Sequence, residues 1–189
     1  MKLTAWLLAL NIFSYPVLAQ DASANTVQKE IEALRGLEYV SIMPGQKVAS
    51  HLSCTEEGGS LLVLRGVLNR EWSKSLLQCQ GHWVITLNRE IAAVSAEGHV
   101  KSRIIDTLVL PPVQFDLDPD NLEALRYSGD SECEIKGLPN TTFIALVRFG
   151  NRKRVDWRNG VEKAWTFDIK QGRIVPVSTK RIVCEPYEP

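Results

Sequence analysis

The chain has 189 residues with 22 basic and 22 acidic side chains, so its formal net charge at neutral pH is zero. A neutral chain has no electrostatic footprint for nucleic acid and no bulk attraction to anionic membranes, which argues against both classes of partner. The length suits one domain with a hydrophobic core of its own.

Residues 1–19 have the pattern of a secretory signal peptide. Lys2 is followed by an apolar run over residues 3–14, and Ala19 is a small residue suited to cleavage. Residues 22–24 offer a second cleavage position. The apolar run is shorter than the ~20 residues that a bilayer-spanning helix needs. We therefore expect export to the periplasm or the cell exterior, with no membrane span left after cleavage.

Four cysteines fall in the expected mature domain, residues 20–189: Cys54, Cys79, Cys133 and Cys184. An even number of cysteines in an exported protein predicts two disulfides, and three pairings exist. We favour Cys54–Cys79 and Cys133–Cys184. Loops of these lengths stabilise a fold by roughly 3.5 and 4 kcal/mol when the gain comes from the entropy of the unfolded chain.

Helical signals are confined to two segments. Residues 20–25 are small and polar and are expected to be flexible, and apolar side chains then follow at helical spacing: Val27, Ile31 and Leu34. Asn25 or Thr26 can cap the start of this helix, and Gly36 can end it. A further helical turn is expected at residues 119–126, where Pro119 suits the first position.

The remainder of the chain reads as short strands rich in Val, Ile, Leu and Thr. The expected strands are 38–42, 47–54, 60–67, 82–87, 90–95, 100–109, 142–149, 162–169 and 173–177. The expected turns include 57–59, 88–89, 150–151, 159–160 and 171–172. We predict a mainly β (α+β) fold: a single antiparallel β sandwich or barrel-like domain with a short N-terminal helix and two disulfides.

The favoured disulfide also predicts a strand register. If Cys54 lies directly across from Cys79 in an antiparallel pair, Val48 faces Ile85 and His51 faces His82. One face of that pair is apolar and the other is polar, as a half-buried sheet requires. The expected core is built from such apolar faces: Val48, Leu52, Leu62, Leu64, Trp83, Ile85, Ile104, Ile144, Leu146, Trp165 and Phe167.

The strongest candidate binding segment is a basic hairpin. Five basic residues cluster around the turn at 150–151, with two aromatic residues among them: Arg148, Phe149, Arg152, Lys153, Arg154, Trp157 and Arg158. Arg and Trp are favoured anchors at protein interfaces. We take Arg152, Arg154, Trp157 and Arg158 as the candidate binding residues for a protein partner. A solvated hairpin tip is the competing interpretation, because charge runs usually solvate a surface.

Metal-like patterns occur twice. The spacing of His51 with Cys54 and of Cys79 with His82 resembles a zinc site, but export favours oxidised cysteines and strand alternation separates the two residue types. Asp116, Asp118 and Asp120 resemble the opening of a calcium loop, which then lacks its Gly and its final Glu. We expect no metal and no cofactor.

Catalytic signatures are incomplete. Asp130, Glu132 and Glu134 surround Cys133 and could supply an acid and a base, but the sequence does not give their separation. The chain has no nucleophile elbow, no zinc-protease helix and no phosphate loop. We assign no catalytic residues.

Three functions are compatible with these patterns. The first is an exported, non-enzymatic binding protein, engaging a protein partner as an inhibitor or immunity-type factor. The second is a small secreted hydrolase of cell-wall or glycan substrate, with His82 or His99 near the carboxylates. The third is an accessory component of an envelope or secretion assembly. We rank the binding protein first because of the expected export, the two expected disulfides, the Arg/Trp hairpin and the lack of a complete catalytic motif; the sequence does not separate it from the accessory component, since both need only a surface.

Overall fold

The structure is a computed structural model, and it describes residues 20–40, 45–93, 100–111, 125–129 and 132–186. The expected signal peptide and the calcium-like segment at residues 116–120 lie outside the described residues. Within the described ranges, no helix is long and apolar enough to cross a membrane.

The described residues form one α-helix, thirteen strands and a short 3-10 helix. In chain order they are α1 (Gln20–Leu34), β1 (Glu38–Val40), β2 (Gln46–Lys47), β3 (Thr55–Leu64), β4 (Val67–Cys79), β5 (His82–Ala93), β6 (Val100–Val109), β7 (Leu125–Gly129), β8 (Cys133–Ile135), β9 (Phe143–Arg148), β10 (Val155–Asp156), β11 (Val161–Asp168), β12 (Arg173–Pro176), η1 (Thr179–Arg181) and β13 (Ile182–Cys184).

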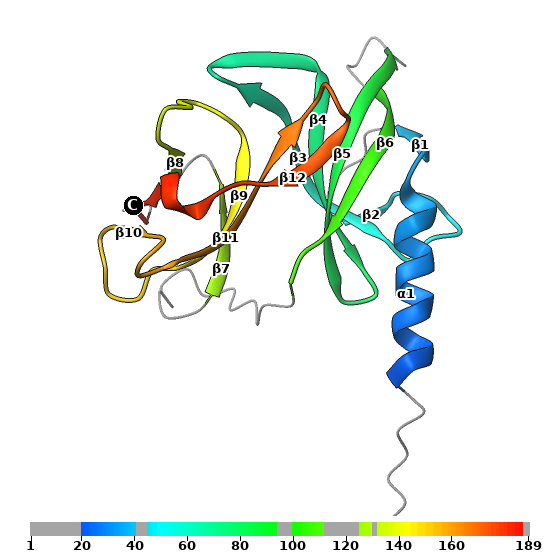
Figure 1. Cartoon of the computed structure of the whole chain (residues 1–189). Coiled ribbons are helices and arrows are strands. Elements are labelled where there is room, and N and C mark those ends of the chain that lie inside the picture. The colour runs from blue at the N-terminus through cyan, green and yellow to red at the C-terminus, as the bar shows by residue number, and fades with distance from the viewer. Residues whose placement is uncertain (1–19, 41–44, 94–99, 112–124, 130–131, 187–189) are drawn as a thin grey trace, which may run out of the picture.

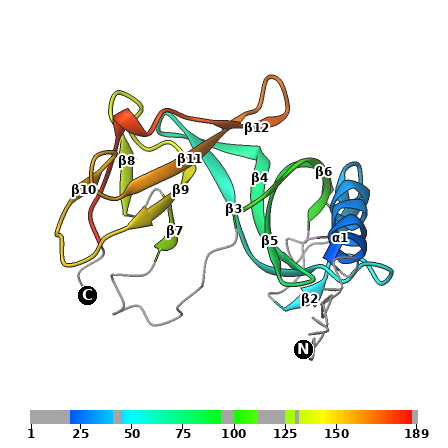
Figure 2. The same ribbon diagram turned by 60° about the horizontal axis from the view of Figure 1, so that its bottom comes forward.

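The strands form three antiparallel sheets. A six-stranded sheet has the order β1-β6-β5-β4-β3-β2, a four-stranded sheet the order β12-β11-β9-β7, and a three-stranded sheet the order β10-β13-β8. The six-stranded sheet curls into a half-barrel with α1 beside it, and the two smaller sheets form the other side of the molecule (Figure 1). Figure 2 shows the curl of β3–β6 from below. The predicted β-rich, barrel-like fold with an N-terminal helix is confirmed.

Helix α1 is longer than expected. It begins at Gln20, so residues 20–25 are helical rather than flexible, and neither Asn25 nor Thr26 caps its start. The first turns contain Gln and Ala, which favour helix without contributing to the apolar stripe that the prediction relied on. The C-terminal boundary is as predicted: the helix ends at Leu34, and Gly36 follows with a φ of 82°, a left-handed conformation that glycine adopts without strain.

The strand predictions fail where polar residues interrupt the apolar pattern. Strand β4 was not expected, because its sequence contains Lys, Arg, Glu, Ser and Gln and shows no clean alternation. Strand β5 runs through the turn expected at 88–89, and the turn expected at 57–59 is a bulge within β3. At 119–126, the two residues that the structure describes, Leu125 and Arg126, begin strand β7 instead of completing a helical turn.

Both predicted disulfides are confirmed, with Cys54 bonded to Cys79 and Cys133 bonded to Cys184. The local register is also right, since Thr55 pairs with Gln78 next to the first disulfide. The direction of the ladder is wrong, however. Pairing extends from that disulfide along β3 and β4, while the chain turns after Cys79 to form β5.

The corrected register changes the predicted pairs. Ile85 pairs with Leu76 rather than facing Val48, and His82 pairs with Cys79 rather than facing His51. The prediction assumed that the strand before Cys54 continues the ladder. The backbone instead folds back on itself there, with the amide of Val48 donating to the carbonyl of Cys54 over 3.0 Å.

The core consists of three clusters. One lies between α1 and the inner surface of the curled sheet, one joins β9 and β11 to the three-stranded sheet, and one joins the curled sheet to the four-stranded sheet. Eight of the eleven predicted core residues are buried, and the exceptions are only half-buried: Leu64, Trp83 and Trp165. On β11, Trp165 and Phe167 belong to the third cluster, as does Ile169 just after the strand ends.

Candidate functional site

The four predicted binding residues lie in the segment that connects β9 to β11 and contains β10. Arg152, Arg154, Trp157 and Arg158 are all exposed, and the Trp157 side chain retains 43% of its accessible surface. Between residues 148 and 158 the sequence has five basic residues and one acidic residue. This segment therefore presents positive charge around an exposed indole ring.

Backbone and side-chain hydrogen bonds hold this segment in one shape. The guanidinium of Arg152 donates to the carbonyl of Asn159 over 3.2 Å, which closes the base of the loop. The Asp156 amide donates to the side chain of Asn159 over 2.7 Å, and the Arg158 amide donates to the Asp156 carboxylate over 2.8 Å. Trp157 thus stands at the centre of a hydrogen-bonded turn.

The predicted arginines have different roles in the structure. Arg154 forms an ion pair with Glu185 at 3.4 Å, and Arg148 forms one with Glu162 at 3.6 Å. Because both pairs are about half exposed, each contributes little to stability. Arg152 is engaged with backbone carbonyls. Of the four predicted residues, the structure brings only Trp157 and Arg158 into direct contact.

A second cation completes this surface. The Arg158 guanidinium carbon lies 5.1 Å from the centre of the Trp157 ring, and the Lys180 ammonium nitrogen, from η1, lies 5.8 Å from it. We call Trp157, Arg158 and Lys180 the cationic tryptophan face. It borders a shallow hollow of about 430 Å³ lined also by Arg148, Asn159, Glu162 and Thr179. Sequence reasoning missed Lys180, since no local pattern joins η1 to this turn.

The other sequence candidates do not assemble into a site. Glu134 is exposed on β8 and Glu132 is half-buried just before that strand, while Asp130 and His99 lie outside the described residues. His51 and His82 are both exposed. In the part of the chain that the structure covers, no group of three or more His, Cys, Asp or Glu side chains is arranged to hold a metal ion.

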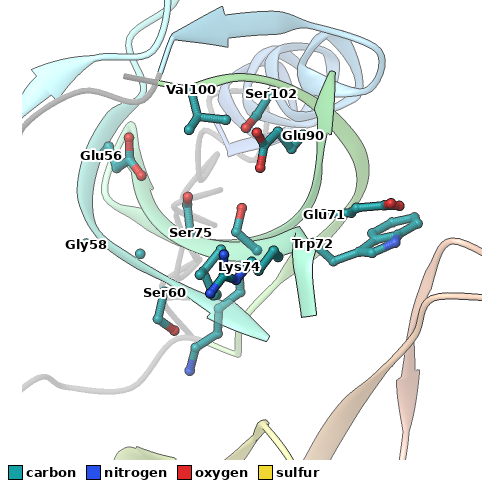
Figure 3. A pocket seen from close by; sticks show the side chains of 14 residues that line it. Glu56, Gly58, Ser60, Glu71, Trp72, Lys74, Ser75, Glu90, Val100 and Ser102 are labelled. Carbon is teal, nitrogen blue, oxygen red and sulfur yellow. The ribbon is translucent and has the colours of Figure 1, made fainter. Parts of the chain in front are cut away.

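The curled sheet contains a cavity, lined by both polar and apolar side chains, that sequence reasoning did not find. Its volume is about 430 Å³, and Glu56, Ser75, Glu90 and Ser102 are among its lining residues. Figure 3 shows these side chains directed toward the space enclosed by the curl. Five of the seven buried polar side chains in the described residues belong to this sheet: Glu56, Ser75, Thr86, Asn88 and Ser102.

A hydrogen-bond network crosses the inside of the curl. The hydroxyls of Tyr39 and Ser75 are 3.2 Å apart, and the side-chain amide of Asn88 donates to the Ser75 hydroxyl over 3.0 Å. Burial raises the pKa of Tyr39 to about 12, and the nearby Glu56 carboxylate adds to the increase. Tyr39 therefore remains a neutral phenol across the physiological pH range.

The cavity was not predicted because two expectations from the sequence were wrong. Strand β4, which supplies Ser75, was not expected, and turns were assigned next to Glu56 and at Asn88. The one available signal is the series Thr86, Asn88 and Glu90, in which polar residues recur at every second position of β5. Alternation of that kind places polar side chains on one face of a strand.

The chain matches no protein-family model, and comparisons with curated proteins and with solved structures find no significant match.

Proposed function

We propose that the protein is an exported, non-enzymatic binding protein that engages an acidic protein partner through the cationic tryptophan face, in an inhibitor or immunity-type role. One observation carries the proposal: Trp157 is 43% exposed, and the cationic groups of Arg158 and Lys180 lie 5.1 and 5.8 Å from its ring centre. An exposed tryptophan next to two cations has the composition of an interface anchor, because Trp and Arg are enriched among the residues that dominate binding energy.

The geometry of the turn favours binding in two ways. First, the bonds from Arg152 and Asp156 hold the turn in place, so less conformational entropy is lost when a partner immobilises Trp157. Second, contact with the indole ring reduces the freedom of the Arg158 and Lys180 side chains, and both residues remain exposed. Carboxylates on a partner would steer its approach and pair with these cations.

Export is supported by the two disulfides, which are typical of proteins outside the reducing cytosol. The absence of a long apolar helix from the described ranges is compatible with it. The hydrolase alternative gains no support from Glu132 and Glu134, neither of which lines the cavity or the hollow. An accessory role in an envelope assembly would require the same kind of surface.

The test is affinity capture with the oxidised protein from the envelope of its host, followed by measurement of the dissociation constant for the captured protein. We expect Trp157→Ala to weaken binding about 30-fold or more, the size of effect seen at interface hot spots. Arg158→Ala and Lys180→Ala should weaken it less and make it less sensitive to salt. Lys163→Ala is the control, since Lys163 is an exposed cation on β11 outside the cationic tryptophan face.

Two results would contradict the proposal. One is a captured partner whose affinity is the same for wild type and Trp157→Ala. The other is a partner surface that is basic rather than acidic, with binding that strengthens as salt is added.

A further inference from the structure

The inside of the curled sheet is divided into an apolar half and a polar half. Helix α1 fills the apolar half, where Ile31 and Leu34 pack with Leu77, Val84 and Ile104. The polar half is not filled by the helix and contains the cavity of about 430 Å³. That volume is within the range of small-molecule sites and far exceeds the ~30 Å³ of one water molecule.

The walls of the cavity are rich in hydrogen-bond acceptors. Glu56 and Glu90 direct carboxylates toward it from different strands, and the hydroxyls of Ser75 and Ser102 lie between them (Figure 3). Arg70, Glu71 and Lys74 also line the site. Lys74 is adjacent to Ser75 in β4, and its side chain extends away from the enclosed space in Figure 3. Neighbouring residues in a strand face opposite sides, which explains the difference.

Two buried polar groups belong to this part of the sheet: Glu56 lines the cavity, and Asn88, which does not line it, is hydrogen-bonded to the lining residue Ser75. Glu56 is only 4% exposed, which is unusual for a carboxylate, because removing its charge from water is costly. Asn88 is fully buried and donates to Ser75, while its amide oxygen accepts no hydrogen bond from any described residue. Buried polar atoms are nearly always satisfied in folded proteins, so such an atom indicates that a donor is supplied from elsewhere.

We propose that this cavity binds a small organic amine in its protonated form. An ammonium group offers three donors and no acceptor, which complements a wall of carboxylates and hydroxyls. Its charge-assisted bonds to Glu56 and Glu90 are stronger than neutral hydrogen bonds. An anion would meet the carboxylates of Glu56 and Glu90, and an apolar molecule would displace water from the polar part of the wall without replacing its hydrogen bonds. This site is independent of the cationic tryptophan face.

Gly59 lies in the wall of the cavity, and its lack of a side chain leaves space there. A Cβ atom at this position would lie 3.1 Å from the Ser75 hydroxyl and 3.2 Å from the Glu56 carboxylate, closer than ordinary contact. The bulge in β3 between Glu56 and Gly58 brings Gly59 to this place. Glycine here leaves room next to both side chains, and Gly59→Ala should reduce that room.

The experiment is titration of the oxidised protein with three probes that share a four-carbon chain: putrescine, butanediol and succinate. Putrescine and 1,4-butanediol carry ammonium or hydroxyl groups at the ends of four methylene groups, and succinate carries carboxylates at the ends of two. We expect saturable binding of putrescine alone, measured by calorimetry and by NMR shifts of the Ser75 and Ser102 amides. Glu56→Gln and Glu90→Gln should each weaken binding about tenfold, the effect of losing one charge-assisted bond. Gly59→Ala should weaken it as well.

Glu57→Gln is the matched control. Glu57 is the exposed neighbour of Glu56, so this substitution removes the same charge from outside the cavity. Glu90→Gln keeps the test decisive if Glu56→Gln does not fold, since Glu90 is only half-buried. The proposal is overturned if putrescine does not saturate, if butanediol or succinate binds as tightly, or if Glu57→Gln weakens binding as much as Glu90→Gln does.

Discussion

Tyr39 lies at the boundary between the apolar and polar halves of the curled sheet. Its ring belongs to the cluster beneath α1, and its hydroxyl reaches Ser75 across the inside of the curl. The same side chain is therefore held by hydrophobic contact at one end and by a hydrogen bond at the other. A buried phenol in this position resists ionisation, because its charged form would lose water and meet the Glu56 carboxylate.

This resistance predicts a loss of stability in alkali. The unfolded phenol releases its proton near pH 10, whereas folded Tyr39 has a pKa of about 12. The stabilising contribution is thus complete below pH 10 and is lost as pH rises through 12, by about 3 kcal/mol in total. Urea unfolding at a series of pH values should show this decline, and Tyr39→Phe should largely remove it. An unchanged decline in Tyr39→Phe would show that other groups cause it.

The identity of the residues in the basic hairpin predicts that they are exposed, but not which contacts each of them makes. The sequence shows that Arg152, Arg154 and Arg158 are basic and close together, which is enough to expect exposure. It does not show that Arg154 pairs with Glu185 or that Lys180 reaches Trp157, because both contacts depend on how η1 and β13 return to this turn. Tertiary placement, not composition, selects which cations remain available.

Elements were predictable where one periodicity dominated. Helix α1 and strands β6 and β11 have clear apolar stripes, and all three were identified. Strand β4 was missed because its residues follow no single pattern. Near its C-terminal end it supplies apolar residues to both faces of the sheet, and before that point it supplies polar residues to the cavity. Leu76 and Leu77 pack into different clusters, so no alternation appears in the sequence. The cavity was missed together with the strand.

The start of β11 depends on a close approach at Gly160. A Cβ atom there would lie 2.5 Å from the Arg148 carbonyl and 2.7 Å from the Val155 side chain. We expect Gly160→Ala to destabilise the protein by about 1 to 3 kcal/mol, as overpacking does, and to displace the turn that presents Trp157. The temperature of thermal unfolding and the affinity for the captured partner should both fall. Gly58→Ala is the control, because a Cβ at Gly58 meets no atom within 4 Å.

If Gly160→Ala and Gly58→Ala unfold at the same temperature, the backbone near Arg148 is more yielding than its contacts indicate. If stability falls but partner affinity does not, the turn keeps its shape despite the displaced strand.

The whole molecule is joined by one shared cluster and a set of hydrogen bonds. Phe167 and Ile144 from the four-stranded sheet pack with Leu62, Ile85 and Leu87 from the curled sheet. At the end of β3, the Val63 amide donates to the Thr142 hydroxyl over 2.8 Å and the Arg65 amide donates to the Thr141 hydroxyl over 3.0 Å. These contacts explain why Thr141 and Thr142 are buried although they are polar.

Such a junction predicts a single unfolding transition for both parts. Phe167→Ala should cost about 3 to 5 kcal/mol, the usual loss for a buried Phe. It should also separate the signals of the two sheets, with far-ultraviolet circular dichroism and tryptophan fluorescence no longer changing together in urea. Lys170→Ala, an exposed change on the same connection, should leave one transition. A single transition in Phe167→Ala would mean that the remaining apolar contacts and the hydrogen bonds are enough to couple the sheets.

The position of α1 also orders the events by which the chain folds. Strands β3 to β6 are neighbours in both sequence and sheet, so they can pair through short loop closures and form early. Helix α1 and β1 come first in the chain, yet their partners β4 and β6 are made much later. We therefore expect the apolar stripe of Val27, Ile31 and Leu34 to stay uncovered until β4 and β6 have formed. Exposed apolar surface of this kind favours aggregation, so the chain should be more prone to aggregate before β6 pairs than afterwards.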